Sequence, residues 1–362
     1  MTSGLDDVIA AETVLSEVDG FGGHLTIRGH ALRDLAGRRD FAGVTHLLFD
    51  GFFADLPDEK ELTARLGQAR VEVFERMQAL LPTLAGLSVY DGMRAGTALM
   101  PDGDTLDDGL RLIAAPAVLT PALIRMRKGL EAIAPVAKAD HAADMLTMLT
   151  GTDASRDLAA ALDTYLVTVC DHGLNASTFA ARVVASTQAG LTSAALAGLG
   201  ALKGPLHGGA PGPVIAMLDT IAATGDAKGW LEKELAEGRR IMGFGHRIYR
   251  VRDPRADVLK AVVRRIGPDG AAGRRLAFAE TVEQAALEIL KGAKPGRVLQ
   301  TNVEFYTALL LEAAGFPEEA FTCVFAAGRI VGWIAHAREQ QATGRLMRPQ
   351  SRYIGPVPDL VA

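Results

Sequence analysis

Between residues 171 and 255, three of the eight histidines in the sequence lie beside glycine in short polar stretches. His172 occurs in DHGLNAST, His207 in GPLHGGAPG and His246 in MGFGHRIYR. Imidazole exchanges protons near neutral pH, and glycine lets the backbone turn sharply or lets a ligand approach closely. Any one of these residues could be an ordinary core or surface histidine, but three in similar settings indicate proton-transfer chemistry.

An acidic residue and an arginine stand in apolar stretches further along the chain. Glu304, in TNVEFYTALLL, is either a helix-start carboxylate favoured by the helix dipole or a general base whose pKa is raised in a partly dry pocket. Arg329 interrupts FAAGRIVGWIA, and a buried guanidinium needs an anionic partner. A substrate carboxylate is a candidate partner, because guanidinium and carboxylate groups pair bidentately.

Other chemistries fit the sequence less well. The three histidines lie 35 and 39 residues apart and no HExxH motif occurs, so we expect no metal site. The nucleotide-binding pattern GxxxxGK[ST] is absent, and GFGHRI lacks the third glycine of GxGxxG. Ser177 is not part of a GxSxG motif, which argues against a serine nucleophile.

The composition indicates a folded protein. The chain has 362 residues, 49% hydrophobic and 22% charged, which suits two domains or one large domain with a smaller lobe. The net charge of -5 argues against a dedicated nucleic-acid binder. Cys170 and Cys323 cannot form a disulfide framework, and the N-terminus has no signal pattern, so we expect a cytoplasmic protein. The longest apolar stretch, residues 112–124, is too short to span a bilayer, so we expect no membrane association.

Helical patterns dominate the elements that must position these residues. Apolar residues recur at helical spacing over 57–81, 272–291 and 317–340. Asp253-Pro254 predicts the start of another helix. Strands are expected only near residues 13–28, where GGHLTIRG predicts a short β-hairpin. The sequence therefore predicts an all-α body with a short N-terminal β-hairpin and with its chemically active residues at helix ends.

Seven motifs, in order, resemble those of the citrate synthase family across almost the whole chain. They are ETVLSEVDGFGGHLTIRGHALRDLA, DHGLNASTFAARVVAST, GALKGPLHGGA, MGFGHRIYRVRDPRA, NVEFYTALLL, AGRIVGWIAHAREQ and RLMRPQSRYIGP. The resemblance implies a mostly helical homodimer whose subunit has two domains. The large domain would comprise residues 1–208 and 319–362, the small domain residues 209–318, and substrate binding would close one onto the other.

The resemblance also implies roles for individual residues. His207 would stabilise the enol form of acetyl-CoA, His246 would polarise the carbonyl of oxaloacetate, and Glu304 would remove the methyl proton. The products would be citrate and CoA, formed through a citryl thioester without any metal or redox cofactor, since the CoA thioester is itself a substrate. The implied ligands are His172, Arg255, Arg329 and the neighbouring subunit's Arg348 for oxaloacetate, Asn175 and Ser177 as further substrate ligands, and Arg250 near the CoA phosphates.

Two departures from the family pattern indicate a divergent branch. Glu304 stands where the usual NVDFY motif has Asp, which adds about 1.5 Å of reach. A misplacement of about 1 Å can cost on the order of 10²-fold in rate. Pro211 and Gly212 replace the Asn and Glu that usually follow HGGA, which could change the start of the next helix or the CoA side of the pocket.

Two alternative functions stay open at the level of sequence. One is a 2-methylcitrate synthase that uses propionyl-CoA, because a hydrophobic pocket separates substrates that differ by one methyl group by only about 1–3 kcal/mol. The other is a catalytically silent relative that binds CoA or a dicarboxylate. The exchange at Glu304 supports the second alternative, whereas the histidines and arginines argue against it.

Overall fold

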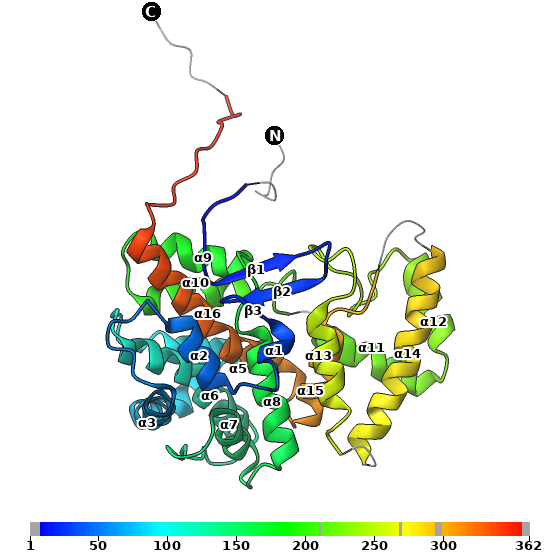
Figure 1. Cartoon of the computed structure of the whole chain (residues 1–362). Coiled ribbons are helices and arrows are strands. Elements are labelled where there is room, and N and C mark those ends of the chain that lie inside the picture. The colour runs from blue at the N-terminus through cyan, green and yellow to red at the C-terminus, as the bar shows by residue number, and fades with distance from the viewer. Residues whose placement is uncertain (1–7, 210, 268–269, 294–298, 357–362) are drawn as a thin grey trace, which may run out of the picture.

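The computed structural model describes residues 8–209, 211–267, 270–293 and 299–356, which form a mainly helical protein with one small sheet (Figure 1). The first elements along the chain are β1 (Ser16–Asp19), β2 (His24–Ile27), β3 (His30–Ala31), α1 (Leu32–Leu35), α2 (Phe41–Phe49), α3 (Glu59–Met77), α4 (Leu81–Ala85), α5 (Val89–Thr97), α6 (Leu106–Arg127), α7 (His141–Thr150), α8 (Arg156–Val169), α9 (Ala176–Ala185) and α10 (Leu191–Leu202). They are followed by α11 (Gly212–Thr224), α12 (Ala227–Ala236), α13 (Pro254–Val263), α14 (Ala271–Ala293), α15 (Val303–Ala313), the 3-10 helix η1 (Glu318–Ala320) and α16 (Phe321–Thr343).

The N-terminal sheet is a β-hairpin with one added strand. β1 and β2 pair antiparallel, with Ser16 opposite Ile27. Asp19 Oδ1 accepts hydrogen bonds from the backbone N–H groups of Phe21 and Gly22, which closes the turn between the strands. This arrangement confirms the predicted hairpin. The short β3, which pairs with β2, is an addition that the sequence did not predict.

Two long apolar helices, α6 and α16, run through the larger helical body. α6 begins with a capping box, in which the side chains of Thr105 and Asp108 each accept the other's backbone N–H. Pro116 and Pro121 lie inside α6, although each removes one helical hydrogen bond, because the surrounding helices bury this stretch. Both helices are long and apolar enough to cross a membrane, so the expectation that the stretch at 112–124 is too short for this was wrong. Most of their residues are buried inside the protein, as in core helices.

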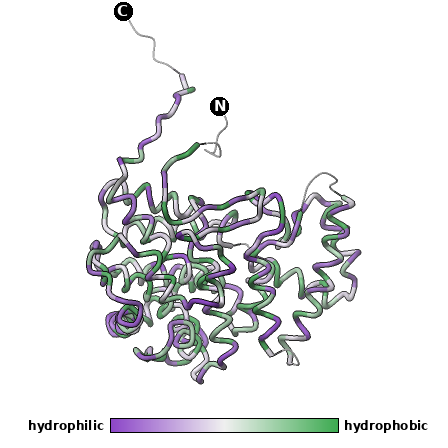
Figure 2. The backbone as a smooth tube through the Cα atoms, viewed as in Figure 1, coloured by the Kyte–Doolittle hydropathy of each residue, from purple (hydrophilic) through white to green (hydrophobic). Residues whose placement is uncertain are grey.

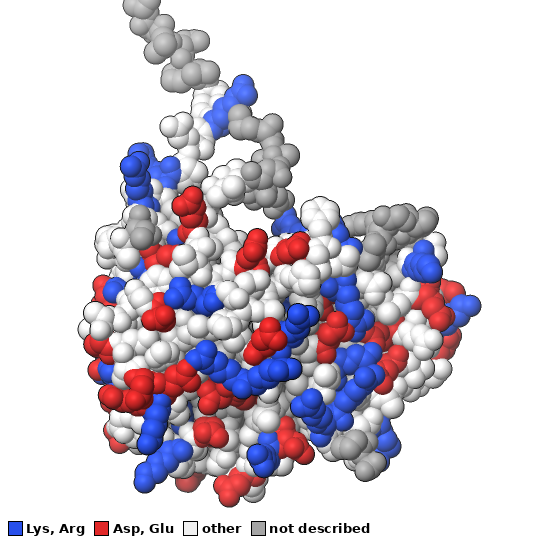
Figure 3. Space-filling view, viewed as in Figure 1, with Lys and Arg blue, Asp and Glu red and all other residues white. Residues whose placement is uncertain are grey.

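The three helices predicted from apolar spacing are all present, as α3, α14 and α16. Asp58 starts α3 by accepting the backbone N–H of Glu61 at 2.9 Å. Hydrophobic and hydrophilic segments alternate along the helices, as expected of amphipathic elements around shared cores (Figure 2). Charges of both signs are interspersed over the face of the molecule shown in Figure 3.

The helices α11, α12, α13 and α14 lie together on the right of Figure 1. α12 packs against α14, and α13 packs against both α15 and α8. The packing of α13 on α8 and α15 brings chain segments before and after residue 209 into contact, and the site lies along these contacts. The domain boundaries at 208/209 and 318/319 stay predictions.

Candidate active site

Six of the predicted site residues lie on three helices and three loops that meet in space. His172 follows α8, His207 follows α10, His246 lies in the loop before α13, Arg255 is in the first turn of α13, Glu304 is in the first turn of α15, and Arg329 is in the middle of α16. Besides burial, the charges of Arg255 and Arg329 both lower the pKa of His172 and of His207. The structure therefore brings these residues within electrostatic reach of one another.

The ring of His246 is held in one tautomer by the backbone. Its Nδ1 lies 3.0 Å from the N–H groups of both Ile248 and Tyr249, so Nδ1 accepts and Nε2 carries the proton. Burial and then the Arg255 charge lower the pKa of His246 to about 4, which keeps the ring neutral. Nε2 lies 3.1 Å from Arg255 Nη2, and both atoms are donors. An imidazole N–H beside a guanidinium suits an acceptor such as a substrate carbonyl or carboxylate oxygen.

Asp253 holds the arginine and the start of α15 together. Its Oδ1 accepts from the backbone N–H and Nε of Arg255, and its Oδ2 accepts from Arg255 Nη2 at 2.9 Å and from the backbone N–H of Val303 at 3.0 Å. Sequence reasoning used Asp253-Pro254 only as a helix start and missed this role. The available signal was the short Asp-Pro-Arg spacing, which lets one carboxylate cap the helix and pair with the arginine.

The loop that carries His246 is also tied to the segment before Glu304. Gly245 N–H donates to Gln300 O at 2.7 Å, and Asn302 N–H donates to Gly243 O at 3.0 Å. Asn302 Nδ2 donates to Gly245 O at 2.8 Å, while its Oδ1 accepts the Glu304 N–H at 3.2 Å. These hydrogen bonds therefore tie the carbonyl-polarising candidate and the base candidate to each other.

The Glu304 carboxylate is buried with an unsatisfied oxygen. Among the described residues, Oε2 has no hydrogen-bond partner. Burial raises the pKa of Glu304, although the Arg255 charge opposes that effect. A desolvated carboxylate without a protein partner is a strong base for its type and is suited to accept a proton from a bound substrate.

His207 is held by a hydroxyl that three groups contact. Ser177 Oγ lies 2.8 Å from His207 Nε2, 3.1 Å from Trp333 Nε1 and 2.8 Å from Asn175 Oδ1. The indole N–H donates to Oγ, so the serine proton goes either to His207 or to Asn175. When His207 Nε2 accepts it, Nδ1 carries the ring proton and can donate to a substrate oxygen. Burial, followed by the charges of Arg329 and Arg255, lowers the pKa of His207 to about 4 and keeps it neutral.

Asn175 and Ser177 use their polar atoms on protein partners in this structure. Asn175 is the N-cap of α9, where Oδ1 accepts the backbone N–H groups of Ser177 and Thr178, both at 3.1 Å. Sequence reasoning missed Trp333, because an indole in an apolar helix resembles an ordinary core residue. Gly198 of α10 makes room for that ring, since a Cβ there would lie 2.6 Å from it.

His172 and Arg329 complete the buried group. His172 Nε2 lies 3.1 Å from the hydroxyl of Tyr249, and burial holds its pKa well below the usual range. Arg329 Nε donates to Val169 O at 2.5 Å, and its Nη2 is buried without a hydrogen-bond partner among the described residues. Burial lowers the pKa of Arg329 to about 10. A buried cation with an unused donor is suited to bind an anion.

Two predicted ligands lie apart from this group. Arg348 is exposed in the extended segment after α16, which leads away from the helical body toward the C-terminus (Figure 1). Arg250 is exposed, and its backbone N–H donates to Gly20 O in the hairpin turn at 2.7 Å. The described chain thus does not bring either side chain to the buried residues.

A cavity of about 520 Å³ opens beside His246. Its wall is largely apolar, and three arginines line it with Gly245 and His246. The lining residues are Leu206, Leu235, Arg239, Arg240, Ile241, Phe244, Gly245, His246, Arg247, Leu290 and Leu299. Sequence reasoning missed Arg239 and Arg240, whose signal is a pair of basic residues shortly before the glycine turn at Gly243. The cavity can take a ligand that is partly apolar and partly anionic.

The second departure from the family pattern, Pro211 and Gly212, lies at the start of α11. α11 begins at Gly212, with Pro211 as its N-cap residue. A Cβ on Gly212 would lie 2.6 Å from Glu318 Oε1, so glycine permits the close approach of η1 to this helix start. Pro211 and Gly212 therefore fit the local packing of this chain.

The two neutral histidines make stability depend on pH. Their folded pKa values, about 4, lie below the ordinary value of 6.5, so the unfolded chain binds more protons between these pH values. The contribution of these rings to the free energy of unfolding is fully present above pH 6.5. It is lost as the pH falls towards 4, by on the order of 2–3 kcal/mol for each histidine. We expect thermal unfolding scans to show this loss, and a His207→Gln/His246→Gln double variant to show a flatter profile. If the Tm of the double variant depended on pH as strongly as that of the wild type, this would contradict neutral rings at His207 and His246 in the folded protein.

The fold and the site together define an all-α enzyme that combines proton transfer with anion binding. The sequence matches the family described as "Citrate synthase, C-terminal domain" over residues 4–350, so this chain belongs to the citrate synthase family. The resemblance and the all-α fold predicted from the sequence are confirmed.

The similar proteins cover nearly the whole chain. The citrate synthase of Haloferax volcanii is 36% identical over 97% of this chain and 95% of its own length. A 2-methylcitrate synthase of Mycobacterium tuberculosis is 34% identical over 97% of this chain and 90% of its own. The structure of the ternary complex of carboxymethyl coenzyme A and oxaloacetate with the citrate synthase of Thermoplasma acidophilum superposes with a TM-score of 0.87, at 26% identity over 100% of this chain and 98% of that one.

Proposed function

We propose that this enzyme condenses acetyl-CoA with oxaloacetate to give citrate and CoA. One observation carries the assignment of the site: the buried Glu304 carboxylate and the buried Arg329 guanidinium each keep an atom that has no hydrogen-bond partner among the described residues. One group is suited to take a proton and the other to hold a carboxylate. The names of the relatives and the ligands of the Thermoplasma structure support the same pair of substrates.

The first step would form the nucleophile. Glu304 accepts a proton from the methyl group of the thioester, and His207 Nδ1–H donates a hydrogen bond to the carbonyl oxygen where negative charge develops. Ser177 would support this role by donating its hydroxyl hydrogen to His207 Nε2, 2.8 Å away, instead of to Asn175 Oδ1. The neutral ring is a suitable donor, because the pKa of His207 lies near 4.

The second step would join the two carbons. The enol carbon attacks the carbonyl carbon of oxaloacetate, while His246 Nε2–H and Arg255 donate to the carbonyl oxygen and stabilise the alkoxide. Arg329 and His172 hold the carboxylates. Water then attacks the citryl thioester, the carbon–sulfur bond breaks, and CoA leaves as the thiol. No metal or redox cofactor takes part in the proposed sequence.

The cavity beside His246 supports a place for CoA. Its apolar wall suits the adenine and pantetheine parts, and arginine suits the phosphates. Arg239 lies at this cavity and also pairs with Glu234 at 2.5 Å. Arg250 remains part of the proposal as a further phosphate contact. A cytoplasmic homodimer that closes on its substrates is proposed from the family resemblance.

The alternative substrate is propionyl-CoA. A relative named 2-methylcitrate synthase is nearly as similar as the citrate synthases, so the acyl preference is open to measurement. We expect a higher kcat/KM for acetyl-CoA than for propionyl-CoA at matched oxaloacetate, measured by thiol release. A higher value for propionyl-CoA would make the enzyme a 2-methylcitrate synthase. Oxaloacetate binding without any thiol release would instead support the catalytically silent relative.

The proposed contribution of Arg348 from the neighbouring subunit predicts complementation. Arg348→Ala and His207→Ala homodimers should each be inactive. Mixed in equal amounts with subunit exchange, they should regain activity at about one quarter of all sites, because one site of each heterodimer has both native residues. Mass spectrometry would confirm the exchange. Heterodimers without recovered activity would show that Arg348 does not act across the interface.

A further inference from the structure

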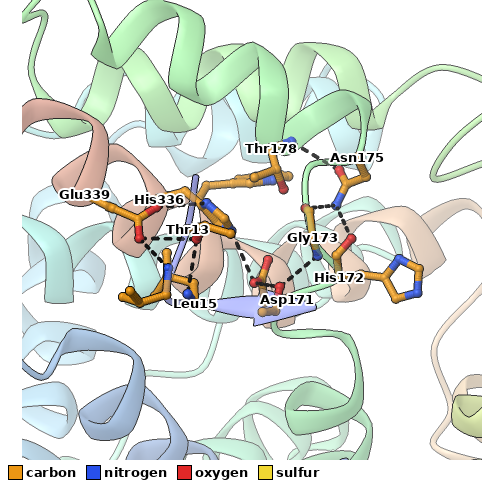
Figure 4. A network of polar contacts seen from close by, with 12 residues as sticks. Thr13, Leu15, Asp171, His172, Gly173, Asn175, Thr178, His336 and Glu339 are labelled. Atoms are coloured by element: carbon orange, nitrogen blue, oxygen red, sulfur yellow. Dashed lines mark hydrogen bonds and ion pairs between the residues drawn. The ribbon is translucent and has the colours of Figure 1, made fainter. Parts of the chain in front are cut away.

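A buried polar network lies directly behind His172, and none of the proposed chemical steps uses it. It links the loop after α8 to α9, α16 and β1 (Figure 4). Its members are Asp171, Arg182, His336 and Glu339, all at most 5% exposed, together with Ser16 of β1. Charged groups at this depth are costly unless they are paired, so their arrangement needs a reason.

One serine hydroxyl fixes both neighbours of His172. Asp171 Oδ2 accepts from Ser16 Oγ at 2.5 Å, and the same Oγ accepts the backbone N–H of Gly173 at 2.9 Å. Gly173 has a φ of 59°, in the left-handed region where glycine is favoured. The residues before and after His172 are therefore clamped to the N-terminal strand.

A histidine from α16 completes the environment of Asp171. His336 Nε2 lies 3.2 Å from Asp171 Oδ2, and His336 Nδ1 lies 2.9 Å from Arg182 Nη1. The guanidinium can only donate, so Nδ1 accepts and Nε2 donates to the carboxylate. Arg182 in turn pairs with Glu339, whose Oε1 accepts the backbone N–H of Val14 at 2.8 Å. The network thus fixes the orientation of Asp171 from two sides.

Asp171 also faces the helix that carries Arg329. Gly332, three residues further along α16, is so close that a Cβ there would collide with Cys170 O and lie 3.2 Å from Asp171 Oδ1. Arg329 itself donates to Val169 O. Asp171 Oδ1 is buried without a hydrogen-bond partner among the described residues, so no described hydrogen bond satisfies this oxygen.

The electrostatics agree with this geometry. Burial lowers the pKa of Arg329, and the Asp171 carboxylate is the main group that opposes this effect. Burial works against ionisation of Asp171, but His336, Ser16 and Arg329 together hold its pKa below the ordinary value. Asp171 is therefore ionised and acts as the counter-charge of a guanidinium with which it forms no direct ion pair.

We propose that Asp171 is a positioning residue for the dicarboxylate substrate: it fixes the loop that carries His172 and balances the charge of Arg329. This inference rests on the proposed roles of His172 and Arg329 in binding oxaloacetate. It makes β1, through Ser16, a structural part of the active site, which explains why a hairpin remote in sequence packs on this loop.

A purely stabilising network would behave differently, and the chain offers a matched control. Arg70 of α3 pairs with Asp144 of α7 at 2.6 Å and lies 3.3 Å from His141 Nδ1, with all three side chains buried. This cluster has the same three residue types as Arg182, His336 and Asp171. It holds none of the proposed site residues, so its loss should affect stability alone.

The experiment measures oxaloacetate Kd by calorimetry, KM for both substrates, and Tm, for Asp171→Asn and Asp144→Asn. We expect both variants to lose Tm, but only Asp171→Asn to raise the oxaloacetate Kd and KM, by about tenfold or more, with the acetyl-CoA KM unchanged. Ser16→Ala should raise the oxaloacetate Kd less, and Ser16→Thr, which keeps the hydroxyl, should restore it. Folded Asp171→Asn with wild-type oxaloacetate affinity would overturn the inference.

The Ser16 variants and Arg329→Gln distinguish the possible outcomes. If Asp171→Asn does not fold, the Ser16 pair decides, and an unchanged Kd in Ser16→Ala overturns the inference. Arg329→Gln tests the underlying site separately. Wild-type oxaloacetate affinity in Arg329→Gln would remove the proposed substrate site itself, whereas weaker binding there combined with wild-type binding in Asp171→Asn would refute only the positioning role.

Discussion

Glu304→Gln is expected to lower kcat by on the order of 10² to 10⁴-fold, the range of positioned acid–base catalysis. Glutamine has nearly the same shape but cannot accept the methyl proton. The Glu304 N–H bond to Asn302 Oδ1 belongs to the backbone and should persist. Steady-state thiol release would give kcat. Calorimetry with oxaloacetate should show an affinity close to wild type, because Arg329 and His172 are intact. Full activity in Glu304→Gln would remove this residue from the mechanism.

Glu304→Asp is the matched control for charge. It keeps the carboxylate but withdraws it by about 1.5 Å. We expect activity to survive at a level between wild type and Glu304→Gln, since a misplacement of about 1 Å can cost on the order of 10²-fold. A rise above wild type would mean that the longer side chain limits this enzyme.

The pH profile provides a second check on the same base. Burial raises the pKa of Glu304, and a base works only when it is deprotonated. The kcat/KM for acetyl-CoA should therefore fall as the pH decreases through that raised pKa, at a pH above the usual range for glutamate. The residual activity of Glu304→Gln should lack this acid limb. An identical limb in both enzymes would assign it to another group.

Local sequence signals predicted helix starts well where a side chain caps the backbone of its own helix. Asp58 and Asp253 cap α3 and α13, as helix-start residues should. The prolines of α6 show the limit of such signals. Proline usually ends or kinks a helix, yet α6 continues through Pro116 and Pro121, because burial by neighbouring helices outweighs two lost backbone hydrogen bonds.

The sequence indicated which residues form the site, but not which other residues hold them in place. Chemistry alone marks His207 and Glu304 as candidates. Trp333, however, stabilises the site from a position that reads as core, and Asp253 from one that reads as a helix cap. Such roles depend on tertiary contacts between distant segments, and a single sequence does not show those contacts. The placement of Arg348 depends on a second subunit and stays a prediction.

His207→Ala is expected to cause the second large loss of kcat. The loss of one donor at a developing oxyanion costs about 10² to 10³-fold in kcat. Ser177, the described side chain that hydrogen-bonds to His207, does not replace the donor, because it is itself held between Asn175 and the indole of Trp333. Oxaloacetate affinity should stay near wild type, since His207 lies on the thioester side of the proposed site. A large loss of that affinity would assign His207 to the dicarboxylate instead.

The tautomer of His207 decides whether this effect arises from a donor at Nδ1. Ser177→Ala removes the hydroxyl that places the proton there, so kcat should fall, although by less than in His207→Ala. Trp333→Phe leaves the serine proton in place and removes only the indole N–H that contacts Oγ at 3.1 Å. It should therefore cost less than Ser177→Ala. A larger loss in Trp333→Phe than in Ser177→Ala would mean that the indole, rather than the serine proton, controls the orientation of the imidazole.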